Sequence, residues 1–299
     1  MRHSLTVLAS ALRGKGSPCE RVRIGGSDAL VARPESGFGP VVVYANAATP
    51  LGIQHLGVAR FLSGLARAGF VVVAPELPHV KEGEVTPATV EALVAVARAA
   101  GPRVALIGAS TGAGLAILAA GDPLLADRVT AVAAIAPFAS LKNLLRLGTT
   151  GFYGDGPFTA APLVARATAR SLTASAPDDP AVPALLANRD PQRFDELYAR
   201  LAPSTRALVT ELSPLSRIGD VLAPVELVSS PDDRFFPVDE SRALARASHD
   251  ARLTVTRALD HVCPRVRPGV VGVLFLLERT LRRAAAAEPV PVLQPSLAS

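Results

Sequence analysis

Val104-Ala105-Leu106-Ile107-Gly108-Ala109-Ser110-Thr111-Gly112 joins an apolar run to a turn of small residues. The continuous apolar run at Val104–Ile107 is typical of a strand that is buried on both faces. Residues 108–112 match the pattern G-x-S-x-G, and Leu115–Ala120 then predicts a helix. A serine at a tight strand-to-helix turn has strained backbone, so the residues two positions away on each side must be small. The pattern therefore predicts that Ser110 stands at the carboxyl edge of a sheet, where the amino end of a helix favours negative charge.

Short apolar runs alternate with longer segments of helical spacing on both sides of this turn. This alternation indicates βαβ units and a parallel sheet. The expected strands are Val41–Ala45, Phe70–Ala74, Val104–Ile107, Val129–Ala136, Val225–Ser229 and Leu253–Thr256, and the expected helices are Leu56–Ala68, Pro87–Ala100, Leu115–Ala120, Glu240–Ala247 and Gly269–Arg283. Ahead of them, Glu20–Arg33 alternates polar and apolar residues around two glycines, which predicts an antiparallel hairpin at the sheet edge.

Residues 139–219 interrupt the alternation and are rich in Ala, Pro and Leu. Helical stretches near Ala161–Ala174, Pro191–Leu201 and Thr205–Leu212 predict a mainly helical insertion. The predicted organisation is an N-terminal extension at 1–19, a sheet-based core at 20–138 and 220–283, the insertion at 139–219, and a disordered tail at 284–299.

Composition excludes several classes of protein. Of the 299 residues, 49% are hydrophobic, which excludes a disordered chain, and two cysteines exclude a disulfide scaffold. The net charge of +5 comes from scattered arginines without a basic run, which argues against nucleic-acid binding and fits a GC-rich bacterial genome. No apolar run has the ~18–20 residues of a membrane span. The segment Met1–Leu12 is shorter than the ~15–30 residues of a signal peptide, so we expect a cytoplasmic protein.

A nucleophilic serine needs a histidine base and an acid, and the expected order along the chain is Ser, Asp or Glu, then His. His261 follows the last predicted strand, whereas His55 and His79 precede the serine. Asp232 and Asp233 both follow the strand at Val225–Ser229. Because sheet ligands bind at the carboxyl ends of strands, Ser110 and His261 are expected to meet there with one of the two aspartates.

Two other interpretations of these residues are open. The glycines of the turn could serve packing alone, and Gly108-x-x-x-Gly112-x-Gly114 is similar to a dinucleotide-binding turn. That turn belongs after the first strand, whereas at least two strand–helix units precede this one. The pairs Asp178-Asp179 and Asp232-Asp233 lie in Pro-rich turns without a histidine spaced to join them, so we expect no metal site and no cofactor.

With these motifs the chain resembles the α/β-hydrolase-fold serine hydrolases, esterase-like and dienelactone-hydrolase-like members included, over roughly residues 20–283. The resemblance implies a mostly parallel, doubly wound sheet with a helical cap at the insertion. It implies that Ser110 is the nucleophile and His261 the base. Asp233 fits the acid better than Asp232, because the family's acid turn places a proline a few residues later, as Pro237 is here.

The sequence departs from the family at the oxyanion loop. Members usually carry His-Gly after the first parallel strand, where this chain has Ala45-Asn46. By alignment the backbone N–H groups of Ala47 and Thr111 are the expected oxyanion donors. Asn46 would occupy a position that tolerates positive φ, which asparagine adopts more readily than most residues.

The expected activity is hydrolysis of a carboxylic ester, or a related acyl bond, of a small to medium uncharged molecule. Thioesterase and acyltransferase chemistry use the same three residues, and a catalytically silent binding protein on the same scaffold is the alternative. The pocket is expected to be apolar, with a few phenylalanines such as Phe138, Phe152, Phe235 and Phe236.

Overall fold

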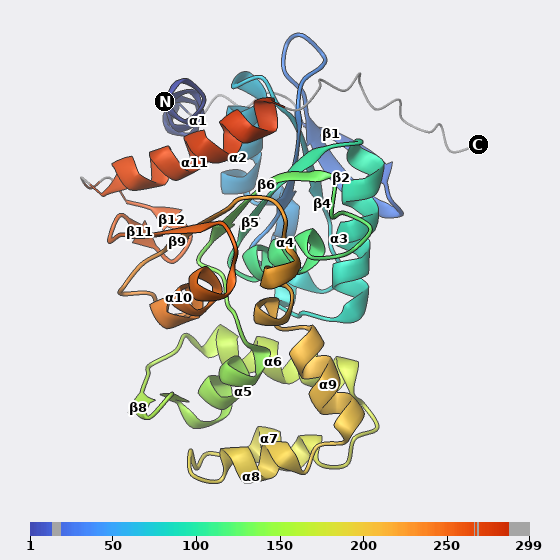
Figure 1. Cartoon of the computed structure of the whole chain (residues 1–299), viewed down its shortest axis with the longest axis vertical. Coiled ribbons are helices and arrows are strands. Elements are labelled where there is room, and N and C mark those ends of the chain that lie inside the picture. The colour runs from blue at the N-terminus through green and yellow to red at the C-terminus, as the bar shows by residue number, and fades with distance from the viewer. Residues whose placement is uncertain (14–18, 266, 268, 287–299) are drawn as a thin grey trace.

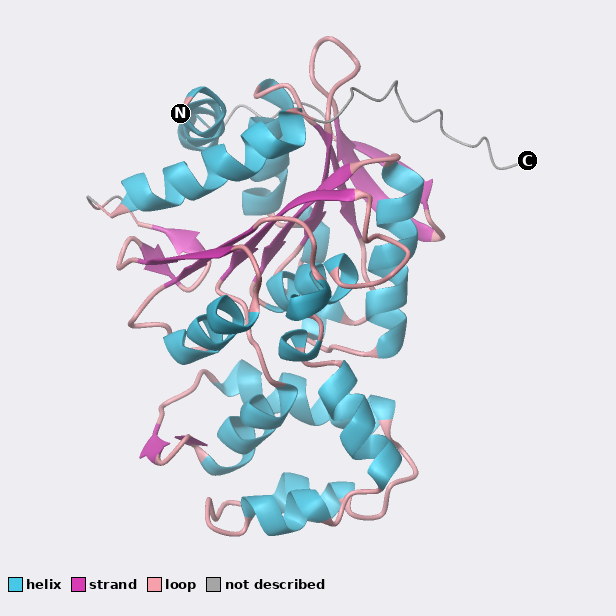
Figure 2. Ribbon diagram, in the orientation of Figure 1, coloured by secondary structure: helices cyan, strands magenta, loops and turns pink. Residues whose placement is uncertain are grey.

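The computed structural model describes residues 1–13, 19–265, 267 and 269–286 of the chain. A sheet flanked by helices forms the larger part, and a smaller group of helices lies beyond one edge of it (Figures 1 and 2). Among the residues so described, no helix has the length and apolar character needed to cross a bilayer.

Eight strands build the main sheet: β1 (Glu20–Ile24), β2 (Ser27–Ala32), β3 (Val41–Ala45), β4 (Val71–Pro75), β5 (Val104–Ala109), β6 (Val129–Ile135), β9 (Val225–Ser229) and β10 (Ala251–Val255). Their order across the sheet is β1-β2-β4-β3-β5-β6-β9-β10. β1 and β2 form the expected edge hairpin, β2 runs antiparallel to β4, and the other pairings are parallel. The prediction of an α/β fold with a mostly parallel sheet is confirmed.

Helices cover both faces of the sheet (Figure 2). They are α2 (Leu56–Arg67), α3 (Pro87–Ala100), α4 (Thr111–Ala120), α10 (Val238–Ala247) and α11 (Val270–Ala285). The central strands are buried on both sides, so neighbouring residues of β3 enter different cores. Val43 packs in the core that contains Leu93 of α3, and Val42 packs in the core that contains Leu62 of α2. This double burial explains why the central strands are continuous apolar runs.

The insertion lies between β6 and β9 and contains α5 (Leu141–Thr150), β7 (Phe152–Tyr153), β8 (Gly156–Pro157), α6 (Pro162–Ser175), α7 (Val182–Ala187), α8 (Phe194–Ala199) and α9 (Pro203–Glu211). It is mainly helical, as predicted. The expected helix at Pro191–Leu201 is shorter in the structure, and α5 and α7 were not expected. Within the described residues there are also four short 3-10 turns: η1 (Gly52–Gln54), η2 (Val80–Glu82), η3 (Pro214–Ser216) and η4 (Ile218–Asp220).

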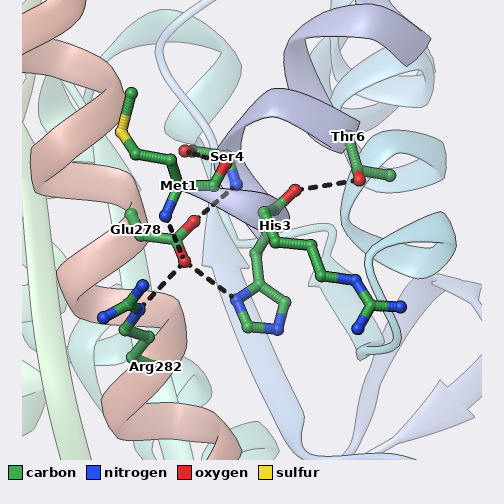
Figure 3. A network of polar contacts seen from close by, with 7 residues as sticks. Met1, His3, Ser4, Thr6, Glu278 and Arg282 are labelled. Carbon is green, nitrogen blue, oxygen red and sulfur yellow. Dashed lines mark hydrogen bonds and ion pairs between the residues drawn. The ribbon is translucent and has the colours of Figure 1, made fainter.

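The N-terminal extension contains a helix, α1 (Arg2–Arg13), that packs against α2 and α11. Figure 3 shows Glu278 of α11 facing its first turn. The Glu278 carboxylate accepts hydrogen bonds from the Ser4 N–H at 2.9 Å and from Arg282 at 3.0 Å, and His3 lies 3.3 Å away. This part of the chain is therefore a packed element of the core rather than a bare extension. At the other end α11 continues to Ala285, so the tail does not begin at 284 as predicted; residues 287–299 lie outside the described part.

Candidate active site

Ser110 lies between β5 and α4 in a strained backbone conformation, with φ 55° and ψ −122°. Its own N–H donates to the carbonyl of Ile135 on the neighbouring strand at 2.8 Å. The flanking glycines have no room for a side chain. A Cβ on Gly108 would overlap the carbonyl of Gly112, and one on Gly112 would overlap the carbonyl of Ala45. Close packing of backbone on backbone therefore holds the serine in a conformation that costs about 1–3 kcal/mol.

His261 lies in the turn of a small hairpin formed by β11 (Leu259–Asp260) and β12 (Cys263–Pro264). The turn gives His261 a positive φ of 53°. Its Nε2 atom is 2.7 Å from the Ser110 Oγ atom, and its Nδ1 atom is 2.8 Å from Oδ2 of Asp233. Because a carboxylate can only accept, Nδ1–H donates to Asp233 and Nε2 is left to accept the serine hydroxyl.

Asp233 is the aspartate that reaches the histidine. Its side chain is fully buried, and its second oxygen, Oδ1, accepts the N–H groups of Phe235 at 2.7 Å and Phe236 at 3.2 Å. Asp232 points elsewhere and pairs with Arg257 at the surface. The structure thus brings together Ser110, His261 and Asp233 and leaves Asp232 outside.

Two phenylalanine rings enclose the imidazole of His261. The Phe235 ring is stacked on it at a centroid distance of 4.2 Å, and the Phe236 ring meets it edge-on at 5.6 Å. Phe236 in turn contacts Phe138, which occupies the space that the absent side chain of Gly114 leaves on α4. Three of the ten phenylalanines of the chain are therefore linked to His261, two by direct ring contact and Phe138 through Phe236.

A small cavity of about 30 Å³ lies against Ser110, between the sheet and helices α5 and α6 of the insertion. Its walls are apolar or carry hydroxyl groups, and none of the lining side chains is charged: Ala48, Gly83, Val85, Ser110, Thr111, Phe138, Leu141, Leu144, Leu163, Val164, Ala167, Thr168, Ser171, Phe235 and Phe236. Three of the four expected phenylalanines are present. Phe152 is not, because it lies in the short strand β7.

The predicted oxyanion donors lie at the start of α4 and in the loop that follows β3. Thr111 is the first residue of α4, where helical N–H groups have no internal acceptor. Among the described residues, no acceptor contacts the backbone N–H of either Thr111 or Ala47. The expectation of a positive φ at Asn46 is wrong, because Asn46 is not among the residues with positive φ. Asn46 is buried, and its Nδ2 atom has no hydrogen-bond partner in the described structure.

A buried carboxylate joins the insertion to α10, the helix that follows the Asp233 loop. Glu240 on α10 accepts the N–H groups of Ala139 at 2.6 Å and Ser140 at 2.8 Å, at the amino end of α5. Its other oxygen accepts from the Asn143 amide and the Tyr153 hydroxyl. Burial, followed by the proximity of Glu240, raises the pKa of Tyr153, so the phenol keeps its proton. Sequence analysis missed this contact because its partners lie about 100 positions apart.

The other two histidines that follow core strands precede helical turns. His55 caps the amino end of α2, where its ring accepts the N–H of Gly57, and His79 directly precedes η2. The described residues contain no group of three or more His, Cys, Asp or Glu side chains placed to hold a metal ion.

Comparison of the sequence with models of known protein families found a match. The model described as "Alpha/beta hydrolase family" matches residues 42–271, which is more than half of the chain and includes Ser110, Asp233 and His261. A search of curated protein sequences found no match.

Many solved structures are similar in fold. An acylaminoacyl peptidase from Pyrococcus horikoshii has a TM-score of 0.61 at 14% identity over 91% of this chain; this chain spans only 42% of the peptidase's length. Est1E from Butyrivibrio proteoclasticus has a TM-score of 0.57 at 12% identity, over 90% of this chain and 100% of Est1E. The 2-hydroxy-6-oxo-6-phenylhexa-2,4-dienoate hydrolase from Rhodococcus sp. strain RHA1 has a TM-score of 0.52 at 21% identity, over 89% and 99% of the two chains. At these identities the likeness shows the fold.

Proposed function

Because the chain belongs to the alpha/beta hydrolase family, we propose that it is a serine hydrolase that cleaves esters through an acyl-enzyme on Ser110. The observation that carries this proposal is the unbroken chain of contacts from Ser110 through His261 to Asp233, at 2.7 and 2.8 Å. These distances lie within the hydrogen-bond reach that proton transfer requires. The Asp233 carboxylate holds the histidine in the tautomer that can accept a proton from the serine.

The proposed reaction has two half-reactions. Ser110 Oγ attacks the ester carbonyl carbon while its proton passes to His261 Nε2, and the resulting imidazolium protonates the departing alkoxide. Water then attacks the acyl-enzyme, with His261 taking its proton and returning one to Ser110. The N–H groups of Thr111 and Ala47 are the proposed donors to the oxyanion. A donor of this kind contributes about 10²–10³ in rate.

The lining of the cavity supports an uncharged ester as the substrate, and the small to medium size remains part of the proposal. Its walls offer no charged group to a peptide terminus or a carboxylate. Neighbours in fold include a protein named as a peptidase and one named as a dienoate hydrolase, so the bond type is part of the proposal. An ester whose acyl group is apolar would replace water against Phe138, Leu141 and Leu144, which is favourable by about 25 cal/mol per Å² of apolar area.

Replacement of Ser110 by alanine tests the proposal. The wild type is expected to hydrolyse a short p-nitrophenyl ester, and Ser110→Ala is expected to lose about 10³-fold or more in kcat/KM. Thr210→Ala, at an exposed site of the insertion, is the control for expression and folding. Equal hydrolysis by the wild type and Ser110→Ala would refute a serine nucleophile.

A catalytically silent binding protein is the competing hypothesis, and the absent His-Gly pair at Ala45-Asn46 favours it. A fluorophosphonate probe separates the two hypotheses, because only an activated serine is labelled. We expect labelling of the wild type that Ser110→Ala abolishes. A panel of esters and thioesters, with and without an added alcohol, then separates hydrolysis from acyl transfer.

A further inference from the structure

Four lining residues of the cavity carry a side-chain hydroxyl: Ser110, Thr111, Thr168 and Ser171. The structure accounts for three of these groups. Ser110 contacts His261, Thr168 donates to the carbonyl of Val164 at 2.9 Å, and Ser171 donates to the carbonyl of Ala167 at 2.8 Å. Each of these hydroxyls therefore has a defined role within the protein.

The Thr111 hydroxyl is different. Thr111 is only 5% exposed as a residue, and its Oγ1 atom forms no hydrogen bond with the residues that the structure describes. This oxygen is not one of the fully buried side-chain atoms that lack a partner, so it is open to the cavity that Thr111 lines. A hydroxyl that is free to bond at the wall of a mostly apolar pocket can fix the orientation of a substrate that lies there.

The surroundings of this hydroxyl are open on one side because a glycine faces it. A Cβ built on Gly83 would lie 3.8 Å from Thr111 Oγ1 and 2.9 Å from the Cβ atom of Ala167. The same Cβ on Gly83 would lie 3.4 Å from the Cβ atom of Ala48. Gly83 also has a φ of +82°, which a residue with a side chain rarely adopts. Three small residues, Ala48, Gly83 and Ala167, therefore leave room beside the Thr111 hydroxyl.

Position along the chain limits which substrate atom can reach this hydroxyl. Thr111 directly follows the proposed nucleophile, and successive Cα atoms are about 3.8 Å apart. The attacked carbonyl carbon lies about 3 Å from the serine oxygen. An atom one or two bonds from that carbon is then near enough to bond with Thr111, whereas the far end of an acyl chain is not.

We propose that Thr111 Oγ1 is a specificity-determining group that hydrogen-bonds an oxygen or nitrogen atom on the carbon next to the scissile carbonyl. The preferred substrates are esters with an α-oxygenated or α-aminated but uncharged acyl group, such as 2-hydroxy esters. The inference rests on the proposed serine-hydrolase function. A site that hydrogen-bonds a substrate hydroxyl discriminates against the analogue that lacks it, because its own polar group is then left unpaired.

The test compares ethyl 2-hydroxybutanoate, each enantiomer separately, with ethyl butanoate by following acid release. We expect the wild type to prefer one enantiomer of the hydroxy ester over the plain ester by about 10-fold in kcat/KM. Thr111→Val removes the hydroxyl but keeps the side-chain shape and the backbone N–H, and is expected to lower this preference about 5-fold or more. Thr111→Ser, which keeps a hydroxyl, is expected to restore most of it.

Thr168→Val is the matched control. It makes the same change in the same cavity, at a hydroxyl that already donates to Val164, and the preference ratio is expected to stay within twofold of the wild type. A ratio near one in the wild type, or an equal fall of the ratio in both valine variants, would overturn the role of Thr111. Hydrolysis of the plain ester would then still support the proposed function. If no ester is cleaved and the fluorophosphonate fails to label Ser110, both proposals fall.

Discussion

Replacement of Glu240 by alanine is expected to destabilise the protein strongly, because this carboxylate joins the insertion to the core. Glu240 is fully buried on α10 and accepts four hydrogen bonds. Two come from the backbone of Ala139 and Ser140, where the chain leaves the core, and two come from Asn143 and Tyr153. No arginine or lysine among the described residues forms an ion pair with Glu240. Its charge is balanced by donors and by the amino end of α5.

The magnitude follows from what each variant leaves unpaired. In Glu240→Ala the N–H groups of Ala139 and Ser140 lose their acceptor at a buried site, at about 1–3 kcal/mol each. The expected loss is about 2–6 kcal/mol, a large share of a typical total of about 5–15 kcal/mol. In Glu240→Gln the side-chain oxygen can still accept the N–H groups of Ala139 and Ser140, while the NH₂ group takes the place of the oxygen that faces Asn143 and Tyr153. The hydrogen bonds lose the added strength of a charged acceptor, at an expected cost of about 2 kcal/mol, which is smaller than the cost expected for the alanine variant.

Urea unfolding followed by circular dichroism measures both variants, with the midpoint and slope fitted together. Glu196→Ala is the control, since Glu196 forms an exposed pair with Arg200 within the insertion. Its expected effect is about 0.5 kcal/mol or less. A loss below about 1 kcal/mol in Glu240→Ala, or equal losses in the alanine and glutamine variants, would refute this account of the contact.

Two further predictions concern His261 and α1. Phe235→Leu is expected to lower kcat about 5-fold, because the stacked ring stabilises an imidazolium by about 1 kcal/mol. Phe138→Leu removes a ring that is not stacked on the histidine, so this variant should mainly change KM. Equal falls in kcat in the two variants would contradict the role of the Phe235 ring. Burial acts to raise the pKa of Glu278, but hydrogen bonds from Ser4, the Met1 amino group and Arg282 outweigh it and lower that pKa from 4.5. The stabilisation that Glu278 contributes is therefore present at neutral pH and declines as the pH falls below about 4.5. Proteolysis of α1 in the wild type is expected to increase over this acidic range. In Glu278→Gln, α1 is expected to be cleaved already at pH 7, and equal cleavage of the two proteins at pH 7 would contradict this prediction.

Local signals were sufficient for much of the core. Helix α3 has the predicted bounds because Thr86 caps it, Pro87 occupies its first turn, and Gly101 follows its last residue. The central strands were predicted from their apolar runs, since burial on both faces leaves no polar position. Helix α5 was overlooked although its signals exist: Ser140 caps it, and leucines recur at helical spacing from Leu141.

Other elements have no local signal of that kind. Helix α1 is held by Glu278, which is more than 270 positions away, so its docking depends on a contact that no window of sequence contains. The hairpin around His261 pairs only two residues on each side, too few for a periodic pattern. The order of Ser110, the aspartates and His261 predicted that they meet, but the choice of Asp233 came from the spacing to Pro237. The two phenylalanine N–H groups that bind Asp233 give the physical reason, because a turn that points them at one carboxylate fixes its orientation.

In the proposed site, the division between core and insertion separates chemistry from selection. Ser110, Asp233 and His261 all lie on loops that follow core strands, and the packing of Gly108 and Gly112 holds the proposed nucleophile without any contact from the insertion. Seven of the fifteen residues that line the cavity belong to α5 and α6. Substitutions on those two helices can therefore change which acyl group fits while the proton path stays intact. Thr111 is the exception, because its backbone N–H belongs to the proposed oxyanion hole and its side chain belongs to the cavity wall. A substitution at Thr111 can therefore change both the rate of hydrolysis and the preference between substrates. Comparing the hydroxy ester with the plain ester separates a change in rate from a change in preference.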